Sequence, residues 1–510
     1  MRGVALAVLL VAVAAVSIRW GSFVAGGSDS YCYVHQASRW ADVLVRPLAG
    51  RLQIPEPLAL EAPWPDAALT FAPVGHIPSP TVPGAIAPMC PAGLSMVMAP
   101  LVVAGGPRAA FAVIPLFAAL LVLATYVVGA RFGVPIGMAA ALLTAASPVV
   151  LYQIVQPMSD VAAAAFWLCA VATATGTGRH HAIWSGLAAS AAIVTRPNLV
   201  PLGFAIGLFL LFRPERAWPA RLRAALTYAA ASAPGCLMVA LIQRTFFGSP
   251  LSSGYGALDE LFAVSHVAPN AQRYFWWLLE THTPALALAA LAPILLPGAM
   301  SALLVALIVI NVGLYLPYTV FEDWSFLRFL LPTLPLMLVL VVAVLDAAWR
   351  RWTPFRDSRA ALAVATAILA VLFIREAVDR SAFRLQQMEA RFERAGTFVG
   401  SRLPRNALVI TSWHSGSVRF YGDRRTLVWD VLDPAWLDRA LAHLRTQGYV
   451  PYLLFEGSEE SRFRRRFAGS AVGALDWPPA VDIDGRVRIY RPDDREAYRQ
   501  GTAPPTEYVR

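Results

Sequence analysis

Two aspartates stand where polar stretches of the sequence meet long apolar runs. Asp29 lies in Gly-Ser-Asp-Ser-Tyr-Cys-Tyr, soon after the apolar N-terminus, and Asp160 lies in Gln-Pro-Met-Ser-Asp-Val, at the start of another apolar run. A carboxylate at such a boundary can act as a base on a hydroxyl or hold a cation. For Asp160 alone a structural interpretation is equally good, because an aspartate at a helix N-terminus caps free N–H groups.

Two arginines also lie beside apolar runs. Arg196 lies in Thr-Arg-Pro-Asn, and Arg328 ends the stretch Glu-Asp-Trp-Ser-Phe-Leu-Arg that begins at Glu322. A guanidinium group presents parallel N–H donors and keeps its charge at any pH, which suits a phosphate ligand. The alternatives are an ion pair of Arg328 with Glu322 or Asp323, and for Arg196 a side chain that reaches from the apolar run to the interface.

Four further side chains are candidates for substrate contacts, namely Tyr31, His35, Tyr255 and Glu322. Tyr255 lies in a loop rich in Gly and Ser, which permit close approach of a ligand, although aromatic residues of this loop also fit an interfacial belt. No cofactor motif is evident, and no Cys or His spacing is typical of a metal site. The two aspartates nevertheless leave room for a divalent cation.

The chain that carries these residues has the composition of an integral membrane protein. Of its 510 residues 57% are hydrophobic and 15% are charged, with a mean hydropathy of +0.55, whereas soluble domains carry about 25% charged residues. The net charge is +10, but the basic residues are all arginine and are dispersed or lie beside apolar runs. We therefore expect membrane lipids, and no nucleic acid, as partners.

The apolar runs predict an all-α polytopic domain of about eleven membrane-spanning helices, since one span needs roughly 17–25 apolar residues. By residue number they are 4–24, 109–129, 134–155, 161–177, 182–196, 199–212, 224–243, 284–297, 299–318, 327–348 and 359–375. The first run resembles a signal peptide, but we expect an uncleaved anchor. The run 91–105 is short and bounded by Pro and Gly, which favours an interfacial or re-entrant helix.

Arginine-rich connections between the runs predict the orientation through the positive-inside rule. These arginines are Arg131, Arg179, Arg213, Arg216, Arg221, Arg223, Arg350, Arg351, Arg356 and Arg359. With eleven spans and a cytoplasmic N-terminus, all of them are cytoplasmic. The loops that hold Asp29, Asp160, Arg196 and Glu322 then face outward, as does the C-terminal region. We expect a multi-pass protein of the cytoplasmic (inner) membrane.

The chain divides into two predicted domains. Residues 1–376 form the membrane domain, with a long, Pro-rich first outer loop at about 26–108, and residues 377–510 form a small extracytoplasmic α/β domain. In the second domain, strand-like runs at 407–411 and 450–455 flank a helix at 434–447, which indicates a partly parallel sheet. His414 follows the first of these strands, in either a ligand-facing or a purely structural loop.

The cysteines leave one question open. Cys32 and Cys90 share the first outer loop and would be able to pair there, whereas Cys169 and Cys236 fall inside apolar runs.

The order of these motifs resembles the C-type (GT-C) membrane glycosyltransferases. The relatives it resembles most are family-39-like protein O-mannosyltransferases, aminoarabinose transferases and their bacterial cousins. Over roughly residues 1–350, the shared pattern is an aspartate beyond the first span, a long first outer loop, a Pro-Gly-Leu-like stretch, a second aspartate before a later span, and an arginine-aromatic-Leu-Leu-Pro run. Here these are Asp29, Pro91-Ala-Gly-Leu94, Asp160 and Arg328-Phe-Leu-Leu-Pro332.

The resemblance implies transfer of a sugar from a polyprenyl-phosphate donor to a protein, lipid or glycan acceptor, with inversion. Asp29 would be the catalytic base, Asp160 would assist at the acceptor or metal site, and Arg328, with Arg196, would hold the donor phosphate. The sequence departs from the pattern in two places. It has no lysine to match that of the aminoarabinose transferases, and the mannosyltransferases' acid-acid pair is here Asp29-Ser30. Two alternatives are a transporter or flippase of a lipid-linked precursor and a non-catalytic membrane assembly protein.

Overall fold

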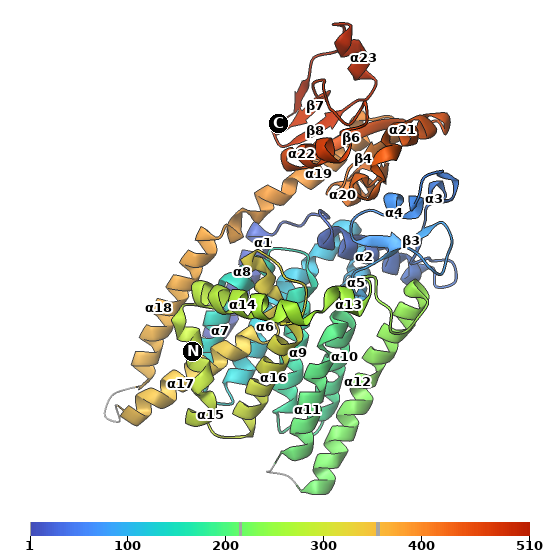
Figure 1. Ribbon diagram of the computed structural model, residues 1–510. Coiled ribbons are helices and arrows are strands. Elements are labelled where there is room, and N and C mark those ends of the chain that lie inside the picture. Colours follow the sequence, from blue (N-terminus) through green and yellow to red (C-terminus); the bar gives the residue numbers. More distant parts are fainter. Residues whose placement is uncertain (1, 214–216, 353–357, 510) are drawn as a thin grey trace.

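The computed structural model describes residues 2–213, 217–352 and 358–509, and it places a bundle of helices beneath a smaller α/β domain (Figure 1). The helices α18 (Ser358–Asp379) and α19 (Leu385–Arg402) connect the two parts. Of the arginines used to predict the orientation, Arg216 and Arg356 lie outside the described residues.

The bundle is built from mostly apolar helices that several prolines interrupt. In chain order they are α1 (Arg2–Trp20), η1 (Pro107–Ala112), α6 (Val113–Gly129), α7 (Val134–Ala146), α8 (Pro148–Gln153), α9 (Ser159–Ala174), α10 (His181–Thr195), η2 (Pro197–Leu199), α11 (Val200–Phe212), α12 (Trp218–Phe247), α13 (Leu258–Leu261), η3 (Val264–His266), α14 (Val267–His282), η4 (Pro284–Leu291), α15 (Ala292–Leu295), α16 (Ala299–Tyr315), η5 (Trp324–Leu330) and α17 (Leu334–Trp352).

The described segments contain four helices that are long and apolar enough to cross a membrane. They are Gly3–Trp20, Pro107–Gly129, Trp218–Phe247 and Arg359–Asp379. Two further pairs of helices are bent by 110° and 82° and raise this number to six if each pair is one span. The other predicted spans correspond to helices of 10–17 residues, so the total of about eleven stays a prediction.

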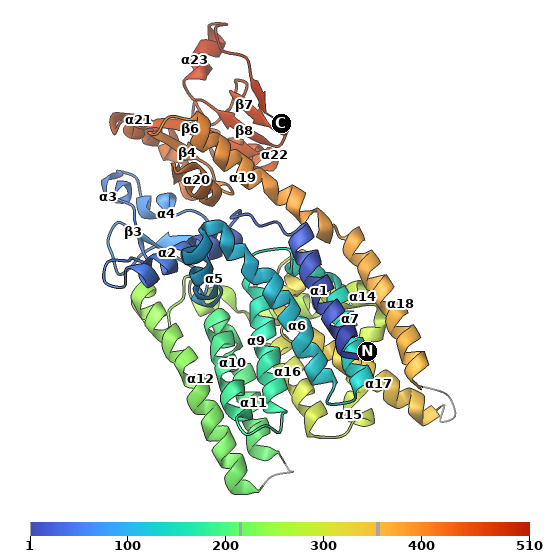
Figure 2. The same cartoon turned by 180° about the vertical axis from the view of Figure 1, so that it is seen from behind.

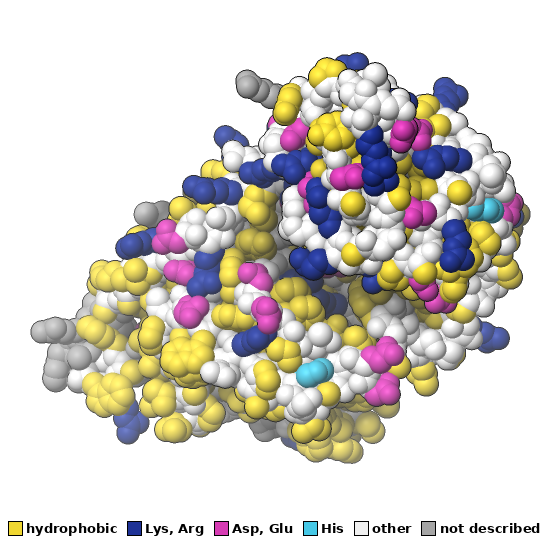
Figure 3. Space-filling model, turned by 45° about the horizontal axis from the view of Figure 1, so that its top comes forward, with side chains coloured by type: hydrophobic (Ala, Val, Ile, Leu, Met, Phe, Trp, Pro, Cys, Tyr) yellow, Lys and Arg dark blue, Asp and Glu magenta, His cyan; other side chains and the backbone are white. Residues whose placement is uncertain are grey.

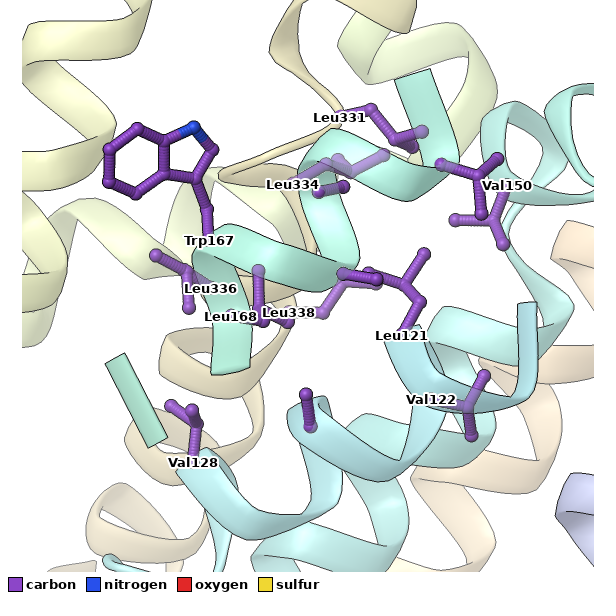
Figure 4. Close-up of a cluster of buried hydrophobic side chains, with 14 of the residues drawn as sticks. Leu121, Val122, Val128, Val150, Trp167, Leu168, Leu331, Leu334, Leu336 and Leu338 are labelled. Carbon is purple, nitrogen blue, oxygen red and sulfur yellow. The ribbon is translucent and has the colours of Figure 1, made fainter. Parts of the chain in front are cut away.

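Close packing of small and branched side chains holds the bundle together. Trp167 and Leu168 of α9 are buried beside Leu121 of α6 and Leu336 of α17 (Figure 4). The run of four alanines at 162–165 is fully buried, because residues of this size let helix backbones approach closely where lipid supplies no hydrophobic driving force.

The outer face of α12 is exposed and apolar, in contrast to the buried helix contacts inside the bundle. This helix lies at one edge of the bundle in both views (Figures 1 and 2), and its side chains Leu226, Leu237 and Leu241 are each more than 60% exposed. A row of exposed leucines along a helix of 30 residues is suited to contact with lipid tails.

The first outer loop is ordered and lies between the bundle and the α/β domain. It contains α2 (Asp29–Val45), α3 (Leu58–Glu61), α4 (Ala67–Phe71), α5 (Ala92–Gly105) and a small antiparallel sheet in the order β1 (Ile54–Pro55), β3 (Ala85–Pro88), β2 (His76–Pro78). Helix α5 packs against α2. Cys32 and Cys90 form a disulfide, which resolves the pairing that the sequence left open and ties the start of α2 to the segment before α5.

The C-terminal domain contains a six-stranded sheet in the order β5-β4-β6-β8-β7-β9. Its strands are β4 (Ala407–Ile410), β5 (Arg425–Leu427), β6 (Val450–Glu456), β7 (Val481–Ile483), β8 (Val487–Tyr490) and β9 (Glu507–Val509), and its helices beyond α19 are α20 (Ser415–Gly422), η7 (Trp429–Val431), η8 (Pro434–Trp436), α21 (Leu437–Thr446), α22 (Gly457–Arg466) and α23 (Asp494–Arg499). β4 pairs in parallel with both β5 and β6. The two strand-like runs and the helix between them lie where the sequence predicts them.

The first outer loop completes the core of this C-terminal domain. Trp64 and Phe71 are buried in one hydrophobic cluster with Trp429 and Phe463. Glu56 is 2% exposed and forms ion pairs with Arg419 and Arg425 of the C-terminal domain at 2.7 and 2.9 Å. The sequence places a domain boundary at residue 377, yet residues 56–71 pack as part of the C-terminal domain.

Candidate active site

Two ion pairs form the centre of the candidate site. Nη2 of Arg328 lies 3.1 Å from Oδ2 of Asp29, and Nη1 of Arg196 lies 2.7 Å from Oδ1 of Asp160. Both pairs lie at the end of the bundle that faces the C-terminal domain, where α2 begins (Figure 1). The structure therefore brings together four residues that the sequence predicts for catalysis and phosphate binding.

Each of the four side chains stands at the end of a structural element. Asp29 is the first residue of α2, and Asp160 is in the first turn of α9. Arg196 lies in the break between α10 and η2, where Pro197 lacks the N–H that would continue the helix. Arg328 is in the last turn of η5. Of these four side chains at helix ends, Asp29 is the most exposed and Asp160 is buried.

The stretch Pro91-Ala-Gly-Leu94 supports this arrangement from α5. A Cβ atom on Gly93 would lie 2.5 Å from the backbone of Thr195, so only glycine permits this approach. The contact places the start of α5 directly beside the residue that precedes Arg196.

The two arginines share an aromatic neighbour. The guanidinium carbons of Arg196 and Arg328 lie 5.3 and 5.4 Å from the centre of the Phe329 ring. Phe329 in turn stacks on Tyr315 with ring centres 4.8 Å apart. Such cation–π contacts hold guanidinium groups in place while leaving their N–H groups available.

Some donors of these arginines lack a well-aligned hydrogen-bond acceptor. Among the described residues, Nε of Arg328 is buried without a hydrogen-bond partner, whereas Nη1 of Arg196 lies 2.7 Å from Asp160 but outside hydrogen-bond geometry. A buried N–H group without an acceptor costs about 1–3 kcal/mol, and more when it is charged. An anion beside Nε of Arg328 would recover that cost.

Tyr33 extends the site along the same face of α2 as Asp29. Its hydroxyl lies 2.7 Å from Oγ of Ser159, the residue before Asp160. Burial and the charge of Asp29 raise the pKa of Tyr33 above its usual range, so its phenol stays protonated. Tyr33 was not among the predicted contacts; its spacing of four residues from Asp29 would have identified it once this stretch was recognised as a helix.

The remaining predicted contacts occupy different places. Tyr255 lies near the two ion pairs: burial raises its pKa, and the charges of Asp29 and Arg196 act on its hydroxyl. Glu322 does not, since its side chain is 91% exposed and its partner is Arg273 at 3.7 Å. The alternative pairing of Arg328 with Glu322 or Asp323 is wrong: Arg328 pairs with Asp29, while Asp323 accepts a hydrogen bond from the N–H of Ser325.

Tyr31 and His35 lie on the face of α2 that is turned toward the C-terminal domain. Their rings stack with centres 5.1 Å apart, and Nδ1 of His35 lies 3.3 Å from Nε2 of His76. A Cβ atom on Gly416 would lie 2.3 Å from the Tyr31 ring. Burial, with the positive charges of Arg39 and Arg419, lowers the pKa of His35 to about 3. These two residues therefore contact the C-terminal domain and not the two ion pairs.

The site offers little for a metal ion in its present arrangement. Within the described ranges, no group of three or more His, Cys, Asp or Glu side chains is placed to hold one. Asp29 and Asp160 are each paired with an arginine, so a divalent cation between them would have to displace both arginines.

Figure 3 shows a hollow between the C-terminal domain and the helical body, with arginine side chains (dark blue) near it. Asp29, whose side chain is 38% exposed, is the most accessible of the four charged residues.

Comparison with known proteins gives a clear result for the fold. No family model and no curated protein sequence matches the chain. Among solved structures, ArnT from Cupriavidus metallidurans bound to undecaprenyl phosphate has a TM-score of 0.57 at 12% identity, covering 95% of this chain and 98% of that one. The apo state of the same protein has a TM-score of 0.56 at 13% identity. An Archaeoglobus fulgidus oligosaccharyltransferase has a TM-score of 0.56 at 13% identity, covering 90% of this chain and 69% of that one.

Proposed function

We propose that this chain, which shares the fold of the C-type membrane glycosyltransferases, transfers a sugar from a polyprenyl-phosphate donor to an acceptor at the outer face of the cytoplasmic membrane. The observation that carries the proposal is the Asp29–Arg328 pair at the accessible end of the bundle. It combines a carboxylate that can take a proton with a guanidinium group that can bind phosphate.

The reaction is a single displacement. Asp29 takes the proton of an acceptor hydroxyl while the oxygen of that hydroxyl attacks the anomeric carbon of the sugar. The bond from that carbon to the phosphate oxygen breaks, and its electron pair leaves with polyprenyl phosphate. Attack from the face opposite the phosphate inverts the configuration of the anomeric carbon. Arg328 and Arg196 stabilise the charge that grows on the leaving phosphate.

Tyr33 and Asp160 have supporting roles in this mechanism. Asp160 is 1% exposed and pairs with Arg196, so it positions the second arginine against the donor. The protonated phenol of Tyr33, oriented by Ser159, supplies a neutral donor beside the acceptor oxygen.

The arrangement of charges supports catalysis at one face over transport through the bundle. The four charged residues lie at the end that faces the C-terminal domain, whereas Arg350 and Arg351, in the last turn of α17, lie at the far end (Figures 1 and 2). A translocation path for a lipid-linked precursor would need charged groups at intermediate depth. The same separation supports an extracytoplasmic C-terminal domain and a cytoplasmic N-terminus.

The experiment is a transfer assay with the purified protein in proteoliposomes. Undecaprenyl-phosphate sugars serve as donors, and a lipid extract of the native membrane serves as the source of acceptor. Transfer should fall by about 10²- to 10⁴-fold in Asp29→Asn, the range for loss of a general base, and should be retained in Asp259→Asn, a change at an exposed aspartate of α13. Full activity in a folded Asp29→Asn variant would remove Asp29 as the base.

A further inference from the structure

A cavity of about 650 Å³ lies on the side of α2 that carries Tyr31 and His35. The first outer loop contributes these two residues and Glu56, and the C-terminal domain contributes the ends of strands and helices around Arg405, Arg425 and Tyr449. Its volume falls within the roughly 300–1,000 Å³ typical of small-molecule sites. No role in the transfer reaction explains this cavity, since the two ion pairs lie on the other face of α2.

The charge of the cavity is positive. Its charged lining residues are Arg405, Arg419, Arg424, Arg425, Glu56 and Asp423. Neutral His35, with its lowered pKa, adds no charge. Four guanidinium groups against two carboxylates favour an anionic ligand.

Arg405 and Arg425 have N–H donors that are not used in hydrogen bonds among the described residues. Arg419 is fully engaged with Glu56, Thr426 and the carbonyl oxygen of Phe71, and Arg424 donates to backbone carbonyls at the end of α19. By contrast, Arg425 is bonded to Glu56 through Nη1 alone, and the exposed Arg405 has no side-chain partner within the part of the chain that is described.

The rest of the lining suits a sugar. Tyr449 presents a partly exposed aromatic ring, and Gln447 and Asn406 present exposed amide groups able to bond hydroxyls. A second cavity of about 670 Å³ shares Arg405, Asp423 and Arg424 with the first. The two cavities therefore adjoin, and together they have room for more than one saccharide unit.

We propose that this cavity binds an acidic saccharide unit of the acceptor, with Arg405 and Arg425 holding its carboxylate or phosphate group. The ligand is an oligosaccharide, because the helix that separates the cavity from Asp29 is about 10–12 Å across with its side chains, more than one sugar ring spans. That the ligand is part of the acceptor rests on the proposed transferase function. That the cavity binds an acidic saccharide does not depend on that function.

Binding is measured on the full chain in detergent by isothermal titration with tetragalacturonate as the acidic probe, maltotetraose as the neutral one and inorganic phosphate as the ion alone. The expected result is that tetragalacturonate binds at least tenfold more tightly than the other two. Arg405→Gln combined with Arg425→Gln should weaken it about tenfold or more, as expected for lost charge-assisted hydrogen bonds. Arg486→Gln, a change at an exposed arginine of the same domain, should have no effect.

Equal affinity for the neutral probe, equal affinity for phosphate alone, no binding of tetragalacturonate, or an unchanged affinity in the double variant would each overturn the proposal. Asp29→Asn separates the two hypotheses. It should lower transfer by about 10²- to 10⁴-fold and leave tetragalacturonate binding intact, so failure of the proposed function would not be mistaken for failure of the cavity.

Discussion

Asp29 and Arg328 are 299 positions apart in the chain, and their side chains meet at 3.1 Å. The pair joins the first helix of the outer loop to the short helix η5 that precedes α17. In the proposed mechanism, Arg328 is shared between the donor phosphate and Asp29.

Arg328→Ala should lower kcat/KM for the donor by about 10²- to 10³-fold, the range seen when one donor to a developing charge is removed. Arg328→Lys should lie between this variant and the wild type, because it keeps the charge but loses the parallel N–H donors. Initial rates at varied donor concentration provide the measurement. Arg375→Ala, on an exposed part of α18, is the matched control, and unchanged kinetics in Arg328→Ala would contradict the assignment.

The Asp160–Arg196 pair should behave as a buried unit. Arg196→Gln leaves the buried carboxylate of Asp160 without its charged partner and should destabilise the protein by about 3–5 kcal/mol. The double variant Asp160→Asn with Arg196→Gln should be less destabilised, because no buried charge is left unpaired. Thermal unfolding of the wild type, Asp160→Asn, Arg196→Gln and the double variant in one detergent measures the coupling. Strictly additive effects would show that the two side chains do not depend on each other.

Phe71→Ala should loosen the C-terminal domain although Phe71 belongs to the first outer loop. The side chain is fully buried in the cluster that contains Trp429 and Phe463, and truncation of a buried phenylalanine costs about 3–5 kcal/mol. Limited proteolysis should then produce new cleavage sites between residues 403 and 509. Leu48→Ala, a change at an exposed leucine of the same loop, should leave the cleavage pattern unchanged. An unchanged cleavage pattern for Phe71→Ala as well would mean that the loop contacts the C-terminal domain without stabilising it.

Glu459 should make stability depend on pH. Burial raises its pKa to about 7, although its carboxylate accepts hydrogen bonds from the N–H groups of Trp413 and Glu456. Because the folded pKa lies above the usual value near 4.5, the folded state holds the proton more tightly between these two values. The contribution of Glu459 to stability is therefore complete below pH 4.5 and is lost as the pH rises to about 7.

The measurement is the unfolding temperature of the wild type and of Glu459→Gln at pH 5 and pH 8. The wild type should lose more stability than the variant between these two values, since the glutamine carries no proton to release. The difference between the two proteins is the informative quantity, because groups other than Glu459 titrate in both proteins. Glu456 adds little in this range, since hydrogen bonds from His414 and Arg391 lower its pKa to about 2 and it stays ionised. Parallel curves would contradict the raised pKa of Glu459.

The sequence was sufficient for features that depend on local pattern. Long apolar runs predict most helices of the bundle, and short continuous apolar runs predict β4 and β6. The sequence also predicts the four charged residues of the site, Asp29, Asp160, Arg196 and Arg328, because charged residues beside apolar runs are rare. The sequence predicts Tyr31 and His35 as substrate contacts in the first outer loop. In helix α2 they follow Asp29 by two and six residues, and both spacings turn their side chains away from Asp29.

Other features depend on contacts between distant segments. Nothing in residues 56–71 indicates that Trp64 belongs to the core of a domain that begins more than three hundred residues later. The bends of 110° and 82° likewise depend on how helices pack, although Pro284 and Pro332 mark where they occur. Lengths of apolar runs alone do not reveal whether such a pair crosses the membrane once.

The packing of the first outer loop against the C-terminal domain has a consequence for biosynthesis. The hydrogen bonds that join Glu56 and Phe71 to Arg419 and Arg425 span 348 to 369 residues of chain. At a synthesis rate of about 5–20 residues per second, the loop waits roughly 20–70 s for its partners. During that time Trp64 and Phe71 are uncovered, so the nascent protein depends on a holding factor, or on rapid interim burial, until the last domain has emerged.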